Sequence, residues 1–286
     1  MTRSVVTAGS GSGGGSGSTL SPSTGNWASG TFGSGLIRIH GASNGVYSFT
    51  APTGTTAVRV RCWGAGGGGS QTANYYGGGG GGFSIGEFAV EAGKTYAITV
   101  GAGGIANSAG GTSSFGSLIS ATGGSGSNSG SPQAGGVGVG GYANHSGGSA
   151  TLSYGGGGGS ASLFGNGNDS ASAASNQKVS GGAGGGLALS SGVPISTQIH
   201  GAVGGLSGSW IKLSDADGGN TNGVRTISTL GSLDMLGTGS GGIGPDYNAN
   251  GSNGGGGGRL SNGGWPGGGG AVSSRYGADG CVIVEY

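Results

Sequence analysis

Hydrophobic and polar residues alternate in several short runs, and each run leads into a turn or a cluster of glycines. The clearest run is AVRVRCW at 57–63. Side chains of a strand point alternately to its two faces. The run therefore predicts a strand with one apolar face (Val58, Val60 and Cys62) and one mixed face (Arg59, Arg61 and Trp63).

Other runs of β-forming residues predict further strands, at 36–40, 46–50, 83–90 and 95–100, with a pair of short strands within 112–122. The sequence EAGK at 91–94 indicates a turn, so we expect 83–90 and 95–100 to form a hairpin. From 123 to about 270 the sequence has no helical period and few strand-like runs.

The chain ends in a strand-like run, CVIVEY at 281–286, which matches 57–63 in length and β-propensity. We expect the two runs to lie side by side. If Glu285 pairs with Arg59 or Arg61 across the strands, Cys281 lies on the arginine face and Cys62 on the opposite one. This arrangement predicts two free cysteines.

Composition changes this picture, because 83 of the 286 residues are glycine and 32% are hydrophobic. Glycine loses the most backbone freedom on folding, so an ordered glycine-rich fold needs dense hydrogen bonding. Between 123 and 270 we expect extended polyglycine-II segments, with about three residues per turn, stacked in layers. The alternative is a set of long mobile loops, which are uncommon in compact domains.

Together these features predict an all-β fold: a small β-sandwich-like scaffold with long glycine-rich loops. Residues 1–35 read as an N-terminal attachment or linker segment, and 36–286 as one domain. Within it, 36–122 supply the scaffold strands, 123–270 the glycine-rich loop region and 271–286 the closing strand. No membrane span or signal peptide is expected. A formal net charge of +1, with 7% charged residues, argues against nucleic-acid binding.

Candidate chemistry is sparse. The three histidines are far apart, so no metal site is expected from them. Two weak calcium-like motifs occur, DADGGN at 215–220 and GGIGPD at 241–246; the first lacks the later glutamate and the second occurs once where tandem copies are needed. No pair of carboxylates stands out among the nine acids. We expect no enzyme activity, cofactor or metal.

Aromatic residues flanked by glycine are the better functional candidates, because loop-borne aromatic rings offer contact area at low entropic cost. The candidate receptor-binding residues are Tyr75, Tyr76, Tyr142, Tyr154, Tyr247 and Trp265, with Trp210 in a similar context. Alternatively, these rings fill gaps between glycine layers.

Four segments together resemble the glycine-rich domain of bacteriophage tail fibre proteins: VRVRCWGAGGGG at 58–69, GGFS at 81–84, the stretch from GKTY at 93–96 to VGAGG at 100–104, and GADGCVIVEY at 277–286. The resemblance covers about residues 46–286. It implies a virion protein of the tail, made in the host cytoplasm, that binds a bacterial surface receptor, either a polysaccharide or an outer-membrane protein.

The same resemblance implies a homotrimer, attached to other tail proteins through the N-terminal segment. The chain lacks the long repetitive shaft of a full fibre and an evident C-terminal chaperone, so we expect a short fibre or a tip piece. The alternatives are a structural virion component, such as a head fibre or decoration protein, a glycine-rich cell-surface or ice-binding protein, and a glycanase.

Overall fold

The computed structural model describes residues 18–20, 36–40, 45–71, 76–127, 131–151, 155–172, 179–182, 184–185, 254, 256–257, 262–272 and 275–286. All regular structure in these residues is β. The strands are β1 (Ser18–Leu20), β2 (Leu36–His40), β3 (Gly45–Thr50), β4 (Ala57–Trp63), β5 (Phe83–Ala89), β6 (Thr95–Val100), β7 (Ser113–Phe115), β8 (Ile119–Ala121), β9 (Gly138–Val139), β10 (Ala143–His145), β11 (Ala171–Ser172), β12 (Val179–Ser180) and β13 (Cys281–Glu285). No described segment forms a helix that could cross a membrane.

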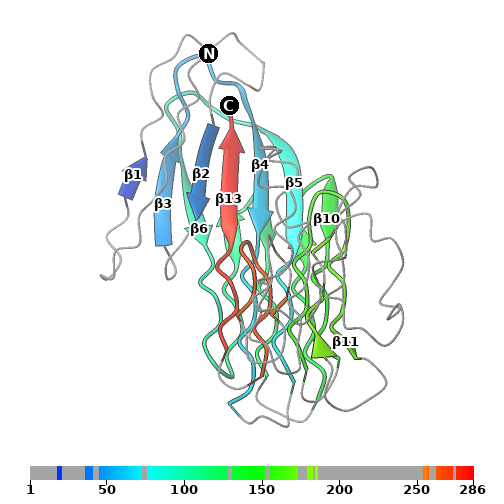
Figure 1. Cartoon of the computed structure of the whole chain (residues 1–286). Helices are drawn as coiled ribbons and strands as arrows, with labels where there is room; N and C mark the ends of the chain where they lie inside the picture. The colour runs from blue at the N-terminus through cyan, green and yellow to red at the C-terminus, as the bar shows by residue number, and fades with distance from the viewer. Residues whose placement is uncertain are drawn as a thin grey trace, which may run out of the picture.

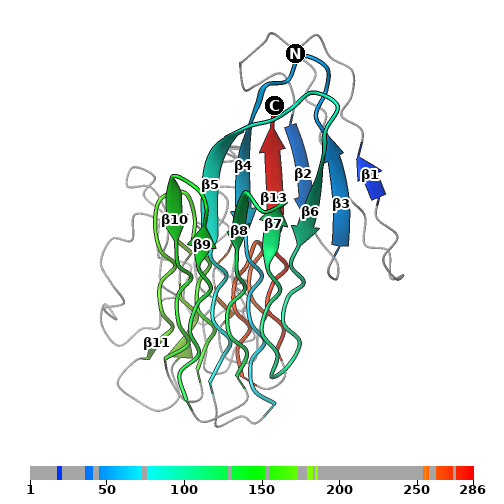
Figure 2. The ribbon, with the colours of Figure 1, turned by 180° about the vertical axis from the view of Figure 1, so that it is seen from behind.

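Two main sheets form the scaffold (Figures 1 and 2). One has six strands in the order β1-β3-β6-β7-β8-β9, and the other has five in the order β10-β5-β4-β13-β2. The pairings are antiparallel, apart from the parallel pairing of β1 with β3. The short pair β11 and β12 forms a separate ladder. The all-β prediction is therefore confirmed.

The sandwich core lies between the two sheets. The apolar face of β4 joins Phe49, Ile98 and Phe115 of the opposite sheet in one buried cluster. The C-terminal Tyr286 closes this cluster against Phe49, with ring centroids 5.4 Å apart. Burial raises the pKa of Tyr286 to about 12.

The final strand lies where the alternation predicted, antiparallel to β4 along its whole length, with Glu285 opposite Arg59. Cys62 faces the sandwich core, whereas Cys281 belongs to a second cluster with Trp63 and Phe83 on the other face of the sheet. Neither cysteine forms a disulfide, and both are buried. The prediction of two unbonded thiols on opposite faces is confirmed.

The predicted hairpin of 83–90 with 95–100 is wrong. β5 pairs with β4 and β10, whereas β6 pairs with β3 and β7 in the other sheet. The 91–94 turn exists, with Gly93 at φ +79° and a hydrogen bond from the Lys94 N–H to the Glu91 carbonyl, but it is a corner that crosses between the sheets. β5 pairs with β4 along its whole length and with β10 at 83–85, whereas β6 pairs with β3 along its whole length in the opposite sheet. The short hairpin within 112–122 is confirmed as β7 and β8.

Beyond the sheets, the chain runs back and forth in extended glycine-rich segments that form the other end of the molecule (Figures 1 and 2). The segment 64–70, which continues β4, shows their hydrogen-bonding rule. Gly64 and Gly67 donate to 79–82, Ala65 and Gly68 donate to 108–111, and Gly66 and Gly69 donate to 275–278. The N–H groups of every third residue thus donate to the same neighbouring segment. This is the pattern expected for a polyglycine-II helix, which has about three residues per turn.

The carbonyls of 64–70 accept from other segments. Gly66 and Gly69 accept from 104–107, Ala65 and Gly68 accept from 124–127, and Gly67 accepts from Gly270. Segment 64–70 is therefore bonded on all sides within a bundle. We call this assembly the glycine bundle; its described segments include 64–70, 76–82, 101–104, 108–111, 122–127, 134–137, 146–150, 157–161, 167–170, 267–270 and 275–280.

Close backbone approach explains the glycine in these segments. A Cβ added at Gly67 would lie 2.1 Å from the Ser125 carbonyl oxygen, and one at Gly80 would lie 1.9 Å from the Gly159 oxygen. Neither residue has the positive φ that would favour glycine. Space, not conformational freedom, requires glycine here. The prediction of packed polyglycine-II segments between 123 and 270 is confirmed for the described residues of that range. The same packing also includes 64–70, 76–82, 101–104 and 108–111, which lie in the range expected to supply only scaffold strands.

Candidate functional site

The glycine bundle has one end joined to the two sheets and one end remote from them, which we call the distal end. Segment 64–70 leaves β4 toward the distal end, and 76–82 returns to β5. The described residues next to these reversals include Gln71, Tyr76 and the turn 105–108. In contrast, Tyr286 at the end of β13 and Leu36 at the start of β2 lie at the sheet end, since Leu36 pairs with Glu285.

The turn 105–108 is fixed firmly to the bundle. The Ser108 N–H donates to the Ile105 carbonyl over 2.9 Å, and Asn107 adopts a left-handed conformation at φ +65°. Asparagine tolerates this conformation better than most residues. The Asn107 N–H donates to Gly69, and its Oδ1 accepts from the Gln71 N–H, each over 3.0 Å.

Ile105 is displayed by this turn with 64% of its surface exposed. A large apolar side chain on a rigid turn is suited to contact with another molecule, because little entropy is lost when the contact forms. At the same end of the bundle, Tyr76 is half-buried and its carbonyl accepts from the N–H of Ser70, the residue before Gln71, over 3.2 Å. Ile105, Asn107, Gln71 and Tyr76 make up what we call the distal patch.

Side-chain hydrogen bonds also join two further segments, 149–151 and 169–170. The Thr151 N–H donates to Ser170 Oγ over 3.1 Å, and the Thr151 hydroxyl donates to the Ser170 carbonyl over 3.0 Å. The Ser149 N–H donates to Asp169 Oδ1 over 2.6 Å. Side-chain hydrogen bonds therefore tie adjacent segments together near the distal end, where the glycine ladder stops.

The structure does not bring the predicted aromatic candidates together as one site. Tyr76 lies in the distal patch. Tyr142 is 65% exposed in the connection between β9 and β10, which are strands of the two sheets and lie at the level of the sheets (Figure 2). Trp265 packs against the second buried cluster, and its indole N–H donates to the Gly280 carbonyl over 3.3 Å. Tyr75, Tyr154 and Tyr247 lie outside the described residues, as does Trp210.

Sequence reasoning missed Ile105, Asn107 and Tyr276. Tyr276 is 53% exposed, and its N–H donates to Asn262 Oδ1 over 3.0 Å. The sequence did contain a signal for the first two, since IANSA at 105–109 interrupts glycine pairs on both sides. Such an interruption marks the point where a polyglycine segment can no longer pack on all sides and reverses.

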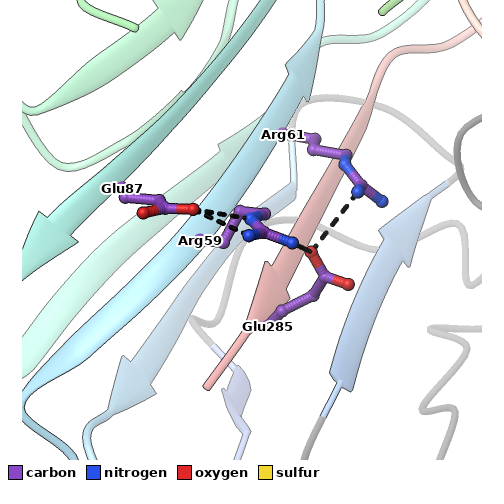
Figure 3. A network of polar contacts seen from close by, with 4 residues as sticks. All are labelled: Arg59, Arg61, Glu87 and Glu285. Atoms are coloured by element: carbon purple, nitrogen blue, oxygen red, sulfur yellow. Dashed lines mark hydrogen bonds and ion pairs between the residues drawn. The ribbon is translucent and has the colours of Figure 1, made fainter. Parts of the chain in front are cut away.

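A charged cluster lies on the outer face of the five-stranded sheet (Figure 3). Arg59 bonds Glu87 over 2.8 Å, and Glu285 lies 3.9 Å from Arg59 and 3.5 Å from Arg61. The hydrogen bond to Glu87 raises the pKa of Arg59. Arg61 is only 6% exposed. The opposite charges are balanced within the cluster, so it stabilises the sheet and offers no free charge for a ligand.

Among the described residues, no group of histidine, cysteine, aspartate or glutamate side chains is arranged to hold a metal ion. Both calcium-like motifs, 215–220 and 241–246, lie outside the described residues. The Cys62 thiol is wholly buried, and this burial raises its pKa, so it is poorly suited to act as a nucleophile.

Comparison with known proteins places the chain in a family without assigning a function. A search of curated proteins found no match. A family model described as a glycine-rich domain matches residues 41–286, which is most of the chain. The match includes the described segments of the glycine bundle and both main sheets apart from their strands β1 and β2. The protein therefore belongs to the glycine-rich domain family.

Proposed function

We propose that the protein is a bacteriophage tail fibre or tail-tip adhesin, which attaches the virion to a receptor on the bacterial surface without catalysis. The observation that carries the proposal is that the two ends of the fold differ. The hydrogen-bonded glycine bundle holds an exposed apolar side chain, Ile105, on an anchored turn at one end. Leu36 and the C-terminus lie at the other end, so the distal patch points away from the entry of the N-terminal residues.

The rigidity of the bundle supports a binding role. Ordering of loops on binding costs affinity, so a preformed surface binds more tightly than a mobile one. The resemblance of 58–69 and 277–286 to tail fibre sequences supports the same function. In this proposal the N-terminal segment attaches to other tail proteins, the assembly is a homotrimer, and the receptor is a surface polysaccharide or an outer-membrane protein. Light scattering that gives the mass of a single chain would exclude the trimer.

Competition for adsorption tests the function. The purified full chain is added to susceptible bacteria before phage, and unadsorbed phage are counted. The protein is expected to block adsorption. Ile105→Asp should weaken the block at least tenfold, because it places a charge in the centre of the proposed contact.

Val46→Asp is the matched control, because Val46 is 53% exposed on β3 and lies in the sheet region. It should block adsorption as well as the unsubstituted protein. Equal melting temperatures of the two variants would show that neither substitution acts by unfolding the chain. A folded protein that leaves adsorption unchanged would refute the receptor-binding role and favour a structural virion component.

A further inference from the structure

One edge of the last strand, β13, is paired by residues that lie outside the family domain. β13 pairs with β4 on one side and with β2 on the other, each through five residue pairs. The family match begins at residue 41, immediately after β2 ends at His40. Among the described strands, β13 is the only partner of β2, which ends the sheet.

Without β2, β13 would be an open edge. Its residues Cys281 to Val284 are wholly buried. Alternate backbone groups of an antiparallel strand point to opposite neighbours, so half of those in β13 would lose their partners. Buried backbone groups rarely stay unpaired. An apolar strand with an open edge is also a ready template for another strand.

We propose that the edge of β13 is a strand-addition site, and that residues 36–40 fill it as a docking strand that fastens the N-terminal residues to the glycine-rich domain. The occupant is the chain's own LIRIH sequence. Strand addition suits this role, because the backbone ladder supplies the affinity and alternate side chains supply the register. Ile37 and Ile39 stand at the register positions of Val284 and Val282, the face that meets the sandwich core.

The position of β2 also suits it to bear load, a consequence that rests on the proposed function. β13 and β4 continue into 275–280 and 64–70, which bond each other directly from Gly66 to Ala278 and from Gly69 to Arg275. A force that pulls on residues before Leu36 while the distal patch is held therefore acts parallel to β2 and β13. All five pairs of the β2–β13 ladder would have to slip together before β2 is released.

The experiment uses the full chain with a protease recognition sequence inserted between His40 and Gly45. After cleavage, the N-terminal fragment is labelled, and its release is followed in the presence of excess unlabelled fragment. The fragment is expected to remain bound through gel filtration. Immediate release from a core that keeps its melting temperature would overturn the proposal.

Proline placed in turn at Ile37, Arg38 and Ile39 then tests for a ladder, with threonine at each position as the matched control. Threonine keeps the backbone N–H that proline lacks, and both alter the side chain. Because N–H groups of an edge strand point alternately toward and away from β13, the proline-to-threonine ratio of release rates should be similar at 37 and 39. The ratio at 38 should differ from these by about tenfold, which corresponds to about one backbone hydrogen bond.

A ratio that is the same at all three positions would overturn the strand-addition site. If a proline variant does not fold, fragment retention in the unsubstituted protein still decides the question. The pairing of β1 with β3 also holds the fragment, but it does not depend on the N–H groups at 37–39, so it cannot produce the alternation. No receptor or bacterium enters this test, so its failure is distinguishable from failure of the adsorption experiment.

Discussion

Replacing Gly67 with alanine should unfold the glycine bundle locally, although alanine is the smallest possible addition. The new Cβ would lie 2.1 Å from the Ser125 carbonyl oxygen and 2.6 Å from its carbon. An ordinary contact begins at 3.4 Å, so the segment 124–127 would have to retreat by about 1.3 Å, the difference between 3.4 and 2.1. No flexible side chain is available to move instead.

This retreat stretches three backbone hydrogen bonds beyond a useful length. They run from Gly124 to Ala65, from Ser127 to Gly68 and from Gly79 to Ser125, at 2.9–3.0 Å. At about 1 kcal/mol each, their loss costs about 3 kcal/mol. The lower entropy of the unfolded alanine chain returns less than about 1 kcal/mol. A net loss of about 2 kcal/mol or more should lower the melting temperature by about 4–8 °C.

Calorimetric melting temperatures of the Gly67→Ala and Ser125→Ala variants, each compared with the unsubstituted chain, check this reasoning. Ser125 is in the same bundle and already has a Cβ, so its substitution should change the melting temperature by only about 1–2 °C, which corresponds to about 0.5 kcal/mol. A Gly67→Ala protein as stable as the unsubstituted chain would refute the reasoning, because it would mean that the segments are not packed at backbone contact.

Three further outcomes are expected. Since the pKa of Tyr286 is raised from 10.0 to about 12, the unfolded state loses this proton first, and the free energy of unfolding should fall between pH 10 and 12; denaturant titrations should show a smaller fall for Tyr286→Phe, and an equal fall would contradict the assignment. Glu285→Gln should destabilise the fold by about 2 kcal/mol, because it removes the partner of a buried arginine, whereas Glu87→Gln at a more exposed pair should cost less than about 1 kcal/mol; equal losses in urea unfolding would argue against the buried pair. A thiol reagent should detect neither Cys62 nor Cys281 in the native protein and both after denaturation, and fewer than two in the denatured chain would refute free thiols on opposite faces.

The sequence allowed one strand pairing of the five-stranded sheet, β4 with β13, to be predicted. The two faces of β4 follow from its alternating residues, and the pairing of Glu285 with Arg59 places Cys281 and Cys62 on opposite faces of the sheet. The crossing of the 91–94 turn between the sheets could not be predicted in this way. A hairpin and a corner share the same strand–turn–strand pattern, and only the pairing of β6 with β3 in the opposite sheet distinguishes them.

The glycine bundle was predictable in kind but not in arrangement. Dense glycine with a low charge content favours packed polyglycine-II helices, and the repeat of about three residues follows from the helix itself. Glycine has no side chain that specifies its neighbour, however, so nothing in the sequence of 64–69 indicates that it lies beside 108–111 and 275–278. The distal patch was missed for the same reason, because its members meet only through this packing. Of the aromatic candidates that the structure describes (Tyr76, Tyr142 and Trp265), only Tyr76 lies there, and the role of all six candidates in receptor binding stays a prediction.

Hydrogen exchange of the glycine amides tests most directly whether the bundle is the rigid support that the proposed function requires. In peptides followed by mass spectrometry, residues 64–69 should exchange as slowly as β4 at 57–63, because their N–H groups are buried and bonded to three neighbouring segments. Exchange of 64–69 within seconds, while 57–63 stays protected, would show that the glycine segments are mobile loops and would contradict the account.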